Sequence, residues 1–228
     1  MEGSPALSLA EDRWLSEQIG KPVFRLWGEP PETLPAGLTY TKLPARDLPL
    51  LHRLQSLGFQ LVVTAVTFES PIPLPNPGPK GPQFRTAELG DETPVLRIAR
   101  ESFVFDRLHA DPEIPNGVAD RVKQAWVANY FSGKRGDWLV IADAGDEPAG
   151  FLLLLGSDGK LVIDLIAVAK AHRGSGLARG MIAFAASTLT QFRTMLVATQ
   201  IANIPSMRLY ERIGFRLVGA QYILHSHR

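Results

Sequence analysis

From residue 83 to the end of the chain, segments with apolar residues at every second position alternate with segments whose apolar residues lie three and four positions apart. Apolar residues at every second position, or short apolar runs between turn residues, predict β-strands, and apolar residues three and four positions apart predict helices. Turn residues between the three middle strands predict an antiparallel meander. The predicted order is a strand at 83–88, helices at 91–103 and 117–131, strands at 137–143, 147–156 and 160–168, a helix at 176–192, a strand at 194–200, a helix at 205–214, and strands at 215–218 and 220–225.

The first part of the chain carries a shorter version of the same patterns. They predict a strand at 21–27, a helix at 45–58 and a strand at 60–69, which together form a small α+β lobe. The segment that follows contains six prolines and two glycines in twelve residues, a composition that disfavours both helix and central strand. We therefore expect an N-terminal lobe at 1–70, a linker at 71–82 and a second domain at 83–228.

Composition narrows the possible chemistry. The 228 residues are 45% hydrophobic, which suffices for real cores, and 24 Lys and Arg against 23 Asp and Glu leave a net charge of +1. This balance gives no general attraction to nucleic acid, so any site for a polyanion has to be local. The absence of cysteine excludes disulfides and a thiol nucleophile. Acidic residues near the start, and no apolar run of membrane-spanning length, predict a cytoplasmic protein without a secretory leader.

One stretch of this balanced chain contains no acidic residue. From Leu165 to Tyr210 there are five Lys or Arg residues and one His, but no Asp or Glu. Four of these six groups flank residues 173–178, whose sequence is Arg-Gly-Ser-Gly-Leu-Ala. A Gly-x-Gly turn that opens a helix presents unpaired backbone N–H groups that can bind phosphate. The alternative is chance clustering of basic residues on a solvated helix face.

Two common phosphate-binding motifs do not fit this turn. A Walker P-loop requires Gly-Lys-Ser/Thr after four intervening residues, and the turn lacks it. A dinucleotide-binding fold requires an acidic residue ~20 positions further on, where this stretch has none, and a parallel strand unit in place of a meander. We therefore expect neither magnesium-dependent nucleotide hydrolysis nor dinucleotide binding.

Residues 163–182 and 199–215 closely resemble the two central motifs of the GCN5-related N-acetyltransferase (GNAT) superfamily. The shared pattern is an apolar strand, a Gly-x-Gly turn that opens a helix, a second strand, Asn, a second helix, Tyr and Gly-Phe. Ala171 departs from the pattern, since the family has Gln or Arg there. The resemblance covers about residues 83–228 and implies an α/β fold with a mixed, mostly antiparallel central sheet flanked by helices.

Within the superfamily, the chain is similar to the TDP-fucosamine acetyltransferase type, which also has a small N-terminal lobe. This resemblance implies acetyl-CoA as cosubstrate, the amine of a nucleotide-linked amino sugar as acceptor, and a homodimer. The alternatives are an amine on a protein, a peptide or a small molecule, and a catalytically silent acyl-CoA-binding module. The similar segments are residues 54–62, 102–115, 126–131 and 197–210.

The resemblance also implies direct attack of the acceptor amine on the acetyl thioester in a ternary complex. Backbone groups of residues 165–168 would pair with the pantetheine arm, and a free N–H near Val168 would polarise the thioester carbonyl. Residues 173–178 would hold the pyrophosphate, and Arg179 or Lys170 would reach the remaining phosphate. The expected coenzyme-binding residues are Leu165, Ile166, Ala167, Val168, Arg173, Gly174, Ser175, Gly176, Leu177, Ala178, Asn203 and Ser206.

Tyr210 is the general acid that the resemblance implies. It follows Asn203 by seven positions, so both lie on one face of the helix. Because the ordinary pKa of a tyrosine is ~10, the phenol stays protonated at neutral pH and can protonate a departing thiolate. A structural tyrosine in the core stripe is the alternative for Tyr210, and a helix cap is the alternative for Asn203.

The general base and the acceptor contacts are less determined. Asp164 lies inside an apolar strand, so its carboxylate either faces the substrate as a catalytic base or has a partner, and water-mediated deprotonation stays open. Arg107, His109 and Arg121, close in sequence to Phe103, Phe105, Trp126 and Tyr130, are the expected acceptor contacts. The alternatives are a solvated His109 and Arg121 and a core Trp126. No cluster has metal-ligand spacing, so no metal is predicted.

Overall fold

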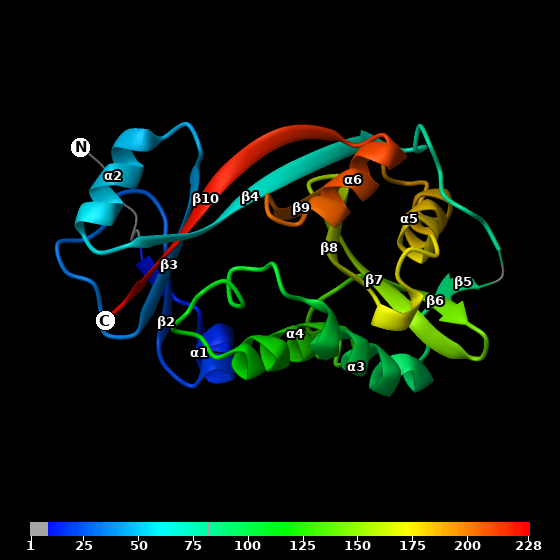
Figure 1. The fold of residues 1–228 in the computed structure, drawn as a ribbon, viewed down its shortest axis with the longest axis horizontal. Helices are drawn as coiled ribbons and strands as arrows, with labels where there is room; N and C mark the ends of the chain where they lie inside the picture. The colour runs from blue at the N-terminus through cyan, green and yellow to red at the C-terminus, as the bar shows by residue number, and fades with distance from the viewer. Residues whose placement is uncertain (1–8, 82) are drawn as a thin grey trace.

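The computed structural model describes residues 9–81 and 83–228. Residues 1–8, which belong to the expected lobe and to the expectation about a leader, and Pro82, which ends the expected linker, lie outside the described residues. One sheet of ten strands, in the order β1-β2-β3-β10-β4-β9-β8-β7-β6-β5, runs through the molecule with helices on both sides (Figure 1). The expected α/β fold class is confirmed.

The elements after the proline-rich segment follow the expected order. The predicted meander is present, since β6, β7 and β8 pair antiparallel, and β8 then pairs in parallel with β9. The elements are β5 (Phe84–Thr86), the 3-10 helix η1 (Leu89–Asp91), α3 (Glu92–Ser102), α4 (Asn116–Phe131), β6 (Trp138–Ala144), β7 (Glu147–Ser157), β8 (Lys160–Val168), the 3-10 helix η2 (Lys170–His172), α5 (Leu177–Thr188), β9 (Thr194–Gln200), α6 (Ile204–Ile213) and β10 (Arg216–His227).

The two final strands predicted at 215–218 and 220–225 are one strand, β10. Its pairing with β4 (Gln60–Pro71) shifts register between Leu217 and Gly219. Such a bulge lets a strand bend without ending, so the glycine that suggested a break is an irregularity inside a continuous strand.

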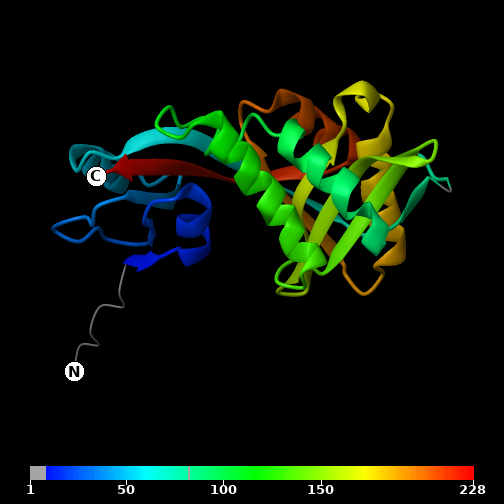
Figure 2. The same cartoon turned by 90° about the horizontal axis from the view of Figure 1, so that it is seen from below.

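The two faces of the sheet carry different helices. On β7, Leu152 and Leu154 belong to the hydrophobic core under α5 and α6, whereas Phe151 and Leu153 belong to the core under α3 and α4. This alternation is expected for a strand that is covered on both sides. Figure 2 shows α4 crossing one face of the sheet toward the small lobe. No helix in residues 9–81 and 83–228 is long and apolar enough to cross a membrane.

The small lobe contains more elements than the sequence predicts. The strand β2, the helix α2 and the strand β4 match predictions, whereas β1, α1 and β3 were missed. In β3, Thr39 and Thr41 are buried beside Leu38 and Tyr40, so the strand shows no hydrophobic alternation. The elements of the lobe are β1 (Leu9–Glu11), α1 (Arg13–Ile19), β2 (Val23–Leu26), β3 (Leu38–Pro44), α2 (Leu48–Ser56) and β4.

The lobe and the second domain exchange strands. The units β3–α2–β4 and β9–α6–β10 share one order of elements, and the strand order β3-β10-β4-β9 places the last strand of each unit between the two strands of the other. Gly58 and Gly214 end the two helices in the left-handed region, and a buried phenylalanine follows each. Figure 1 shows β4 and β10 as long neighbouring ribbons between the two ends of the molecule. The division at residue 70 therefore lies within a continuous sheet and stays a prediction.

The proline-rich segment packs against the second domain along its course. Leu74 is buried in the core under α5 and α6. The N–H of Ile72 donates to the carbonyl of Arg193 at 2.9 Å, and that of Asn76 to the carbonyl of Ile213 at 3.1 Å. The segment thus connects the lobe and the second domain and also covers part of that core.

Candidate active site

The sheet opens between its two central parallel strands. β8 and β9 pair only from Leu161 to Ile163 on β8, although β8 continues to Val168. The N–H of Ala169 donates to the carbonyl of Ala149 on the β7 side at 2.8 Å. Because successive residues of a strand direct their backbone groups to opposite edges, the N–H and C=O of Val168 point into the gap between β8 and β9. The opening therefore presents the N–H of Val168, near the end of β8, without a partner on β9.

A β-bulge at Asp164 lies just after the last residue of β8 that pairs with β9. Leu154 pairs with Ile163 and Leu153 with Leu165, so Asp164 has no partner on β7. Before the bulge, Ile163 belongs to the core under α5 and α6; after it, Leu165 belongs to the core under α3 and α4. A single extra residue thus reverses the faces of the strand at the point where β8 leaves β9.

Both carboxylate oxygens of Asp164 accept hydrogen bonds. Trp126 Nε1 donates to Oδ2 at 2.8 Å, and Arg135 donates to both carboxylate oxygens, at 2.9 and 3.1 Å. The Arg135 guanidinium carbon also lies 5.2 Å from the centre of the Trp126 ring. Of the two outcomes that the sequence leaves open, the structure has the partnered carboxylate. A carboxylate that already accepts three N–H groups is poorly placed to remove a proton from substrate, so we do not retain Asp164 as the base.

The glycine turn meets the start of α5 as expected. Gly174 and Gly176 adopt φ values of 82° and 86°, which favour glycine, and a Cβ at Gly174 would meet no atom within 4 Å. No side chain caps α5, and in the described chain no backbone acceptor pairs with the N–H groups from Gly174 to Arg179. These groups form an open anion cradle at a helix N-terminus. Arg173 Nε donates to the carbonyl of Val168 at 3.1 Å, which ties the cradle to the opening between the strands.

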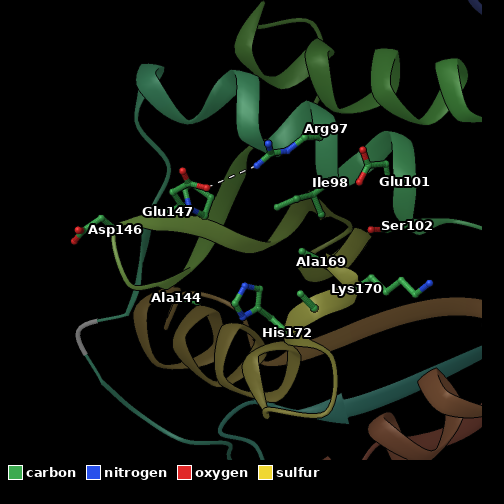
Figure 3. A pocket seen from close by; sticks show the side chains of 12 residues that line it. Arg97, Ile98, Glu101, Ser102, Ala144, Asp146, Glu147, Ala169, Lys170 and His172 are labelled. Atoms are coloured by element: carbon green, nitrogen blue, oxygen red, sulfur yellow. Dashed lines mark ion pairs between the residues drawn. The ribbon is translucent and has the colours of Figure 1, made fainter.

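Arg179 has a different role from the one expected. Its Nη2 donates to the carbonyls of Asn76 and Pro77, at 3.3 and 2.9 Å, so it holds the proline-rich segment against α5. Lys170 instead lines a pocket of about 330 Å³ beside the cradle. Figure 3 shows that this pocket lies between the segment Ala169–His172 and helix α3, where Arg97 pairs with Glu147 at 3.8 Å. This pocket is not among the features predicted from the sequence.

Tyr210 lies in the core under α5 and α6. Its ring centre is 5.9 Å from that of Phe68 and 5.6 Å from that of Phe215. Ile166 and Val168 of the opening pack against the same cluster. Burial raises the pKa of the Tyr210 hydroxyl, and no residue of the described chain accepts or donates a hydrogen bond to it. The phenol is therefore protonated at neutral pH and available as a donor.

Asn203 caps the helix that carries Tyr210. Its Oδ1 accepts from the N–H of Ser206 at 3.3 Å, and its Nδ2 donates to Thr199 Oγ1 at 3.2 Å. The cap role weighed in the sequence analysis is thus present. Since the amide nitrogen carries two hydrogens, one has no acceptor in the described chain.

The expected acceptor residues occupy separate places. His109 is bonded to Asp106 at 2.5 Å and to Asp120 at 3.0 Å, and it lines a pocket of about 660 Å³ between α3 and the start of α4. Burial opposes the charge on His109, but the hydrogen bonds and charges of these two carboxylates outweigh it and raise the pKa. Arg121 is exposed on α4 and makes no ion pair in the described chain, whereas Arg107 lies on the side of the small lobe. The three residues do not form one contact set.

Comparison with known proteins identifies the family. The sequence profile of the acetyltransferase (GNAT) family matches residues 95–215, more than half of the chain. The chain belongs to this family. The match includes the opening, the anion cradle and Tyr210.

The similarity of this GNAT protein to individual relatives extends beyond residues 95–215. The spore coat polysaccharide biosynthesis protein SpsD of Bacillus subtilis (strain 168) is 27% identical over 189 residues, 82% of this chain and 65% of that protein. The chain therefore spans just under two thirds of this relative. A functionally unknown conserved protein from Staphylococcus epidermidis ATCC 12228 superposes with a TM-score of 0.68 at 14% identity, over 100% of this chain and 94% of that one. A GCN5-related N-acetyltransferase from Sphaerobacter thermophilus superposes with a TM-score of 0.57 at 15% identity, over 84% of this chain and 60% of that one. These structures show the fold alone.

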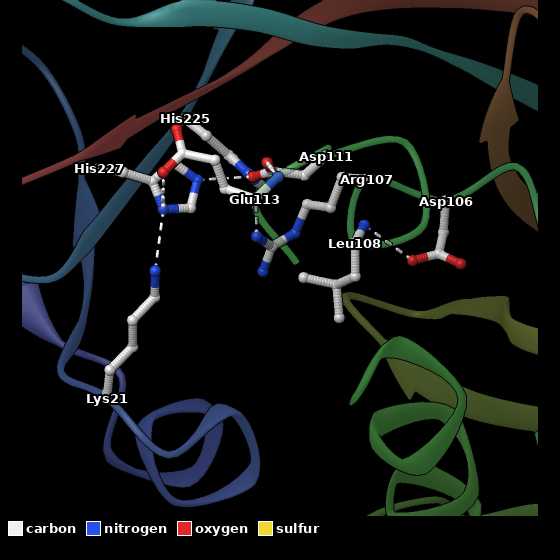
Figure 4. A network of polar contacts seen from close by, with 8 residues as sticks. All are labelled: Lys21, Asp106, Arg107, Leu108, Asp111, Glu113, His225 and His227. Carbon is white, nitrogen blue, oxygen red and sulfur yellow. Dashed lines mark hydrogen bonds and ion pairs between the residues drawn. The ribbon is translucent and has the colours of Figure 1, made fainter. Parts of the chain in front are cut away.

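A polar network that the sequence analysis missed lies at the small-lobe end of this GNAT chain (Figure 4). His225 Nδ1 lies 2.6 Å, and His227 Nε2 lies 2.8 Å, from Oδ2 of the buried Asp111. Arg107 is 2.9 Å from Nε2 of His225, and Lys21 Nζ is 2.9 Å from Nδ1 of His227. Two histidines at positions i and i+2 of a strand were the available signal, because they share a face.

The geometry of this network favours hydrogen bonds over a metal. The three ligand-type atoms of Asp111, His225 and His227 lie within 4.8 Å of one another. If a metal replaced the contacts to Asp111, each histidine would carry its proton on its outer nitrogen, the one that faces away from Asp111. Metal-bound histidines donate that proton to an acceptor. Here both outer nitrogens face donors, Arg107 and Lys21. The network is instead satisfied when each histidine accepts from its cation and donates to Asp111.

We expect Asp111→Asn to lower the free energy of unfolding by ~2 kcal/mol, because the buried histidines lose a charged acceptor. For a chain of this size that is a fall in Tm of about 4–8 °C. The surrounding hydrogen bonds hold the pKa of Asp111 below its usual range despite the opposing effect of burial. The carboxylate therefore stabilises the fold above its unfolded pKa of ~3.9, and its contribution falls as pH drops below that value.

Urea unfolding of both proteins between pH 7 and pH 3 measures this contribution. The gap between wild type and Asp111→Asn should be constant down to about pH 5 and narrow below about pH 4. Glu113→Gln is the control, since that carboxylate is largely exposed and 3.8 Å from His227, and it should change stability by less than about 0.5 kcal/mol. An Asp111→Asn protein as stable as wild type at pH 7 would contradict the network.

Proposed function

We propose that this GNAT protein transfers the acetyl group of acetyl-CoA to a primary amine, most concretely the amine of a nucleotide-linked amino sugar. The observation that carries the proposal is the continuity of three features. The free N–H of Val168 lies at the opening of the sheet, Arg173 ties the open cradle at the start of α5 to this residue, and Val168 packs against the core that contains Tyr210. Family membership supports assigning acetyl transfer to this opening.

In the proposed reaction, the amine nitrogen attacks the thioester carbonyl carbon directly. Negative charge develops on the carbonyl oxygen, and the N–H of Val168 is placed to stabilise it. The carbon–sulfur bond then breaks, and Tyr210 donates its proton to the departing sulfur. The amine gives its proton to water, because the Asp164 carboxylate is occupied by Trp126 and Arg135. The products are an amide and coenzyme A, and a proton from water restores the phenol of Tyr210.

Different residues of the chain would hold different segments of acetyl-CoA. The free N–H groups from Gly174 to Arg179 suit a pyrophosphate, since they converge at the positive end of a helix. Backbone groups of residues 165–168 suit an extended amide chain that pairs as a strand would. Asn203 and Ser206 begin the helix of Tyr210, and the free hydrogen of Asn203 Nδ2 suits a carbonyl of that chain.

The acceptor class rests on two supports. The relative SpsD is named for polysaccharide biosynthesis, which is consistent with a sugar acceptor. Arg107, an acceptor contact predicted from the sequence, donates to no carboxylate in the described chain, and an anionic acceptor would supply the missing counter-charge. A homodimer and a cytoplasmic location stay predictions from the sequence.

Thiol release from acetyl-CoA, followed across a panel of amines, tests the acceptor class. We expect turnover on TDP- or UDP-linked amino sugars and at least tenfold lower kcat/KM on amine-bearing peptides and polyamines, which cannot pair with the same cations. Turnover confined to peptides or free amines would refute the sugar acceptor and leave acetyl transfer standing. Binding of acetyl-CoA without turnover on any amine would refute catalysis and favour an acyl-CoA-binding module.

A further inference from the structure

Two strands of the small lobe and a loop of the second domain bring three cations around one tyrosine. β2 and β3 pair in parallel with Arg25 opposite Tyr40, so both side chains share a face. Lys42 follows two residues after Tyr40 and points to the same face. Arg107 lies over the Tyr40 ring, with its guanidinium carbon 4.0 Å from the ring centre. We call Arg25, Lys42 and Arg107 the lobe cations.

Among the residues that the structure describes, the lobe cations have no anionic partner. Arg25 and Lys42 are exposed and form no hydrogen bond or ion pair within residues 9–81 and 83–228. Arg107 bonds only to Nε2 of His225, at 2.9 Å, and burial lowers the pKa of that histidine, which keeps its ring neutral. Unpaired cations that share one face repel each other, so an anion that binds between them relieves this repulsion.

The neighbouring carboxylates do not supply that anion. Asp12 accepts from the Tyr40 hydroxyl at 2.9 Å and caps α1. Asp106 lies 3.6 Å from the buried Lys123 and also bonds to His109. Asp164 is held by Trp126 and Arg135. Each nearby acid is already paired, and the excess positive charge faces solvent at Arg25 and Lys42.

The electrostatics of Lys42 support this account and locate the cluster. The pKa of Lys42 is lowered, first because the surrounding protein displaces water, and then by the charges of Arg107, Arg25 and Lys123. The charge of Asp164 acts in the opposite direction. Asp164 is the bulge residue at which β8 leaves β9, so Lys42 lies on the side of the molecule where the amine would react.

We propose that Arg25, Lys42 and Arg107 bind the diphosphate of the acceptor, so that the small lobe selects nucleotide-linked amines. The inference rests on the proposed function, since the acceptor must carry the anion. Neighbouring strands are ~5 Å apart and alternate residues of a strand ~7 Å apart, a spread that suits two linked phosphates better than one carboxylate. Two arginines add bidentate donors for phosphate oxygens.

This anion site would be distinct from the cradle at α5. The cradle lies at the end of β8, where the turn enters a helix on one face of the sheet. The lobe cations lie on β2, β3 and the loop before α4, which covers the other face. Two anionic ligands could therefore be held at once with the amine of one near the thioester of the other. Such an arrangement is what direct transfer in a ternary complex requires.

Titration of UDP and TDP into the protein saturated with coenzyme A tests the site without turnover, because the coenzyme fills the cradle. We expect wild type to bind one of these diphosphates and Lys42→Gln and Arg25→Gln each to weaken that binding about tenfold. Arg193→Gln removes an exposed cation just before β9, outside the small lobe, and should stay within about twofold of wild type. Thermal melts confirm that all four proteins are folded.

Steady-state kinetics separates failure of this inference from failure of the proposed function. With a nucleotide-linked amino sugar, Lys42→Gln should raise the acceptor KM about tenfold and leave kcat and the acetyl-CoA KM near wild type. Equal diphosphate affinity in wild type, Lys42→Gln and Arg25→Gln, or no binding to wild type, would overturn the anion site even if the amino sugar is acetylated. Diphosphate binding with the expected losses, but no acetylation of any amine, would uphold the anion site and overturn the proposed function.

Discussion

Tyr210→Phe should lower kcat by about 100-fold or more and leave the KM for acetyl-CoA within about twofold of wild type. The substitution removes only the hydroxyl, so the ring keeps its contacts with Phe68 and Phe215 and the fold is preserved. Without the phenol, the sulfur departs as an unprotonated thiolate from a largely apolar site. The loss therefore falls on the transition state and leaves binding intact.

The pH profile adds an independent check on Tyr210. Because burial raises the pKa of its hydroxyl, the phenol should stay protonated through the accessible alkaline range, and kcat of wild type should show no loss from this group below about pH 10. Tyr222→Phe removes the same atom from a partly buried tyrosine on β10 that packs against the core of the small lobe, and it serves as the control. A Tyr210→Phe protein with the kcat of wild type would show that the phenol is structural.

Gly176→Val should weaken coenzyme A binding about 10- to 100-fold, with little effect on the affinity for the acceptor. A β-branched side chain at a φ of 86° is strained by about 1–2 kcal/mol, and relief of this strain rotates the N–H groups that form the cradle. Since the anion is held by the direction of several N–H groups, a small rotation removes more than one hydrogen bond. Direct titration with coenzyme A measures the effect.

Gly20→Val is the matched control for this variant. Gly20 ends α1 at a φ of 82° in open space, so the substitution introduces the same backbone strain in the small lobe. Both variants should lose similar stability in a thermal melt, but only Gly176→Val should lose coenzyme affinity. Equal coenzyme affinity in the two variants would mean that the turn at 173–178 does not bind the pyrophosphate.

The sequence predicts the second domain better than the small lobe, for a physical reason. After residue 83, α3 and α4 pack on one face of the sheet and α5 and α6 on the other, so the hydrophobic positions of these strands and helices recur regularly. In β3, by contrast, buried Thr39 and Thr41 interrupt the pattern, and β1 is only three residues long. The exchange of β4 and β10 between the two units depends on pairings between distant segments, which no local pattern contains.

Some features of the candidate site come from local sequence, whereas others join residues that are far apart in the chain. The glycine turn and the cap at Asn203 are local features: the sequence alone predicts the turn, and it offers the cap as the alternative role of Asn203. The engagement of Asp164 joins residues 29 and 38 positions apart, and the pairing of Asp111 with His225 spans 114 positions. The lobe cations come from β2, β3 and the loop before α4, so only the folded chain reveals that they share a face. The bulge that reverses β8 also has no signature beyond an acid in an apolar strand.

Transfer of a labelled acetyl group tests the central claim most directly. The protein is incubated with acetyl-CoA that carries a deuterated acetyl group and with TDP- and UDP-linked amino sugars, and the acceptors are analysed by mass spectrometry. We predict that one labelled acetyl group appears on the amine of an amino sugar with wild type, and that Tyr210→Phe forms it at least about 100-fold more slowly. Labelled peptides or small amines with unlabelled sugars, or no labelled amine at all, would contradict the account.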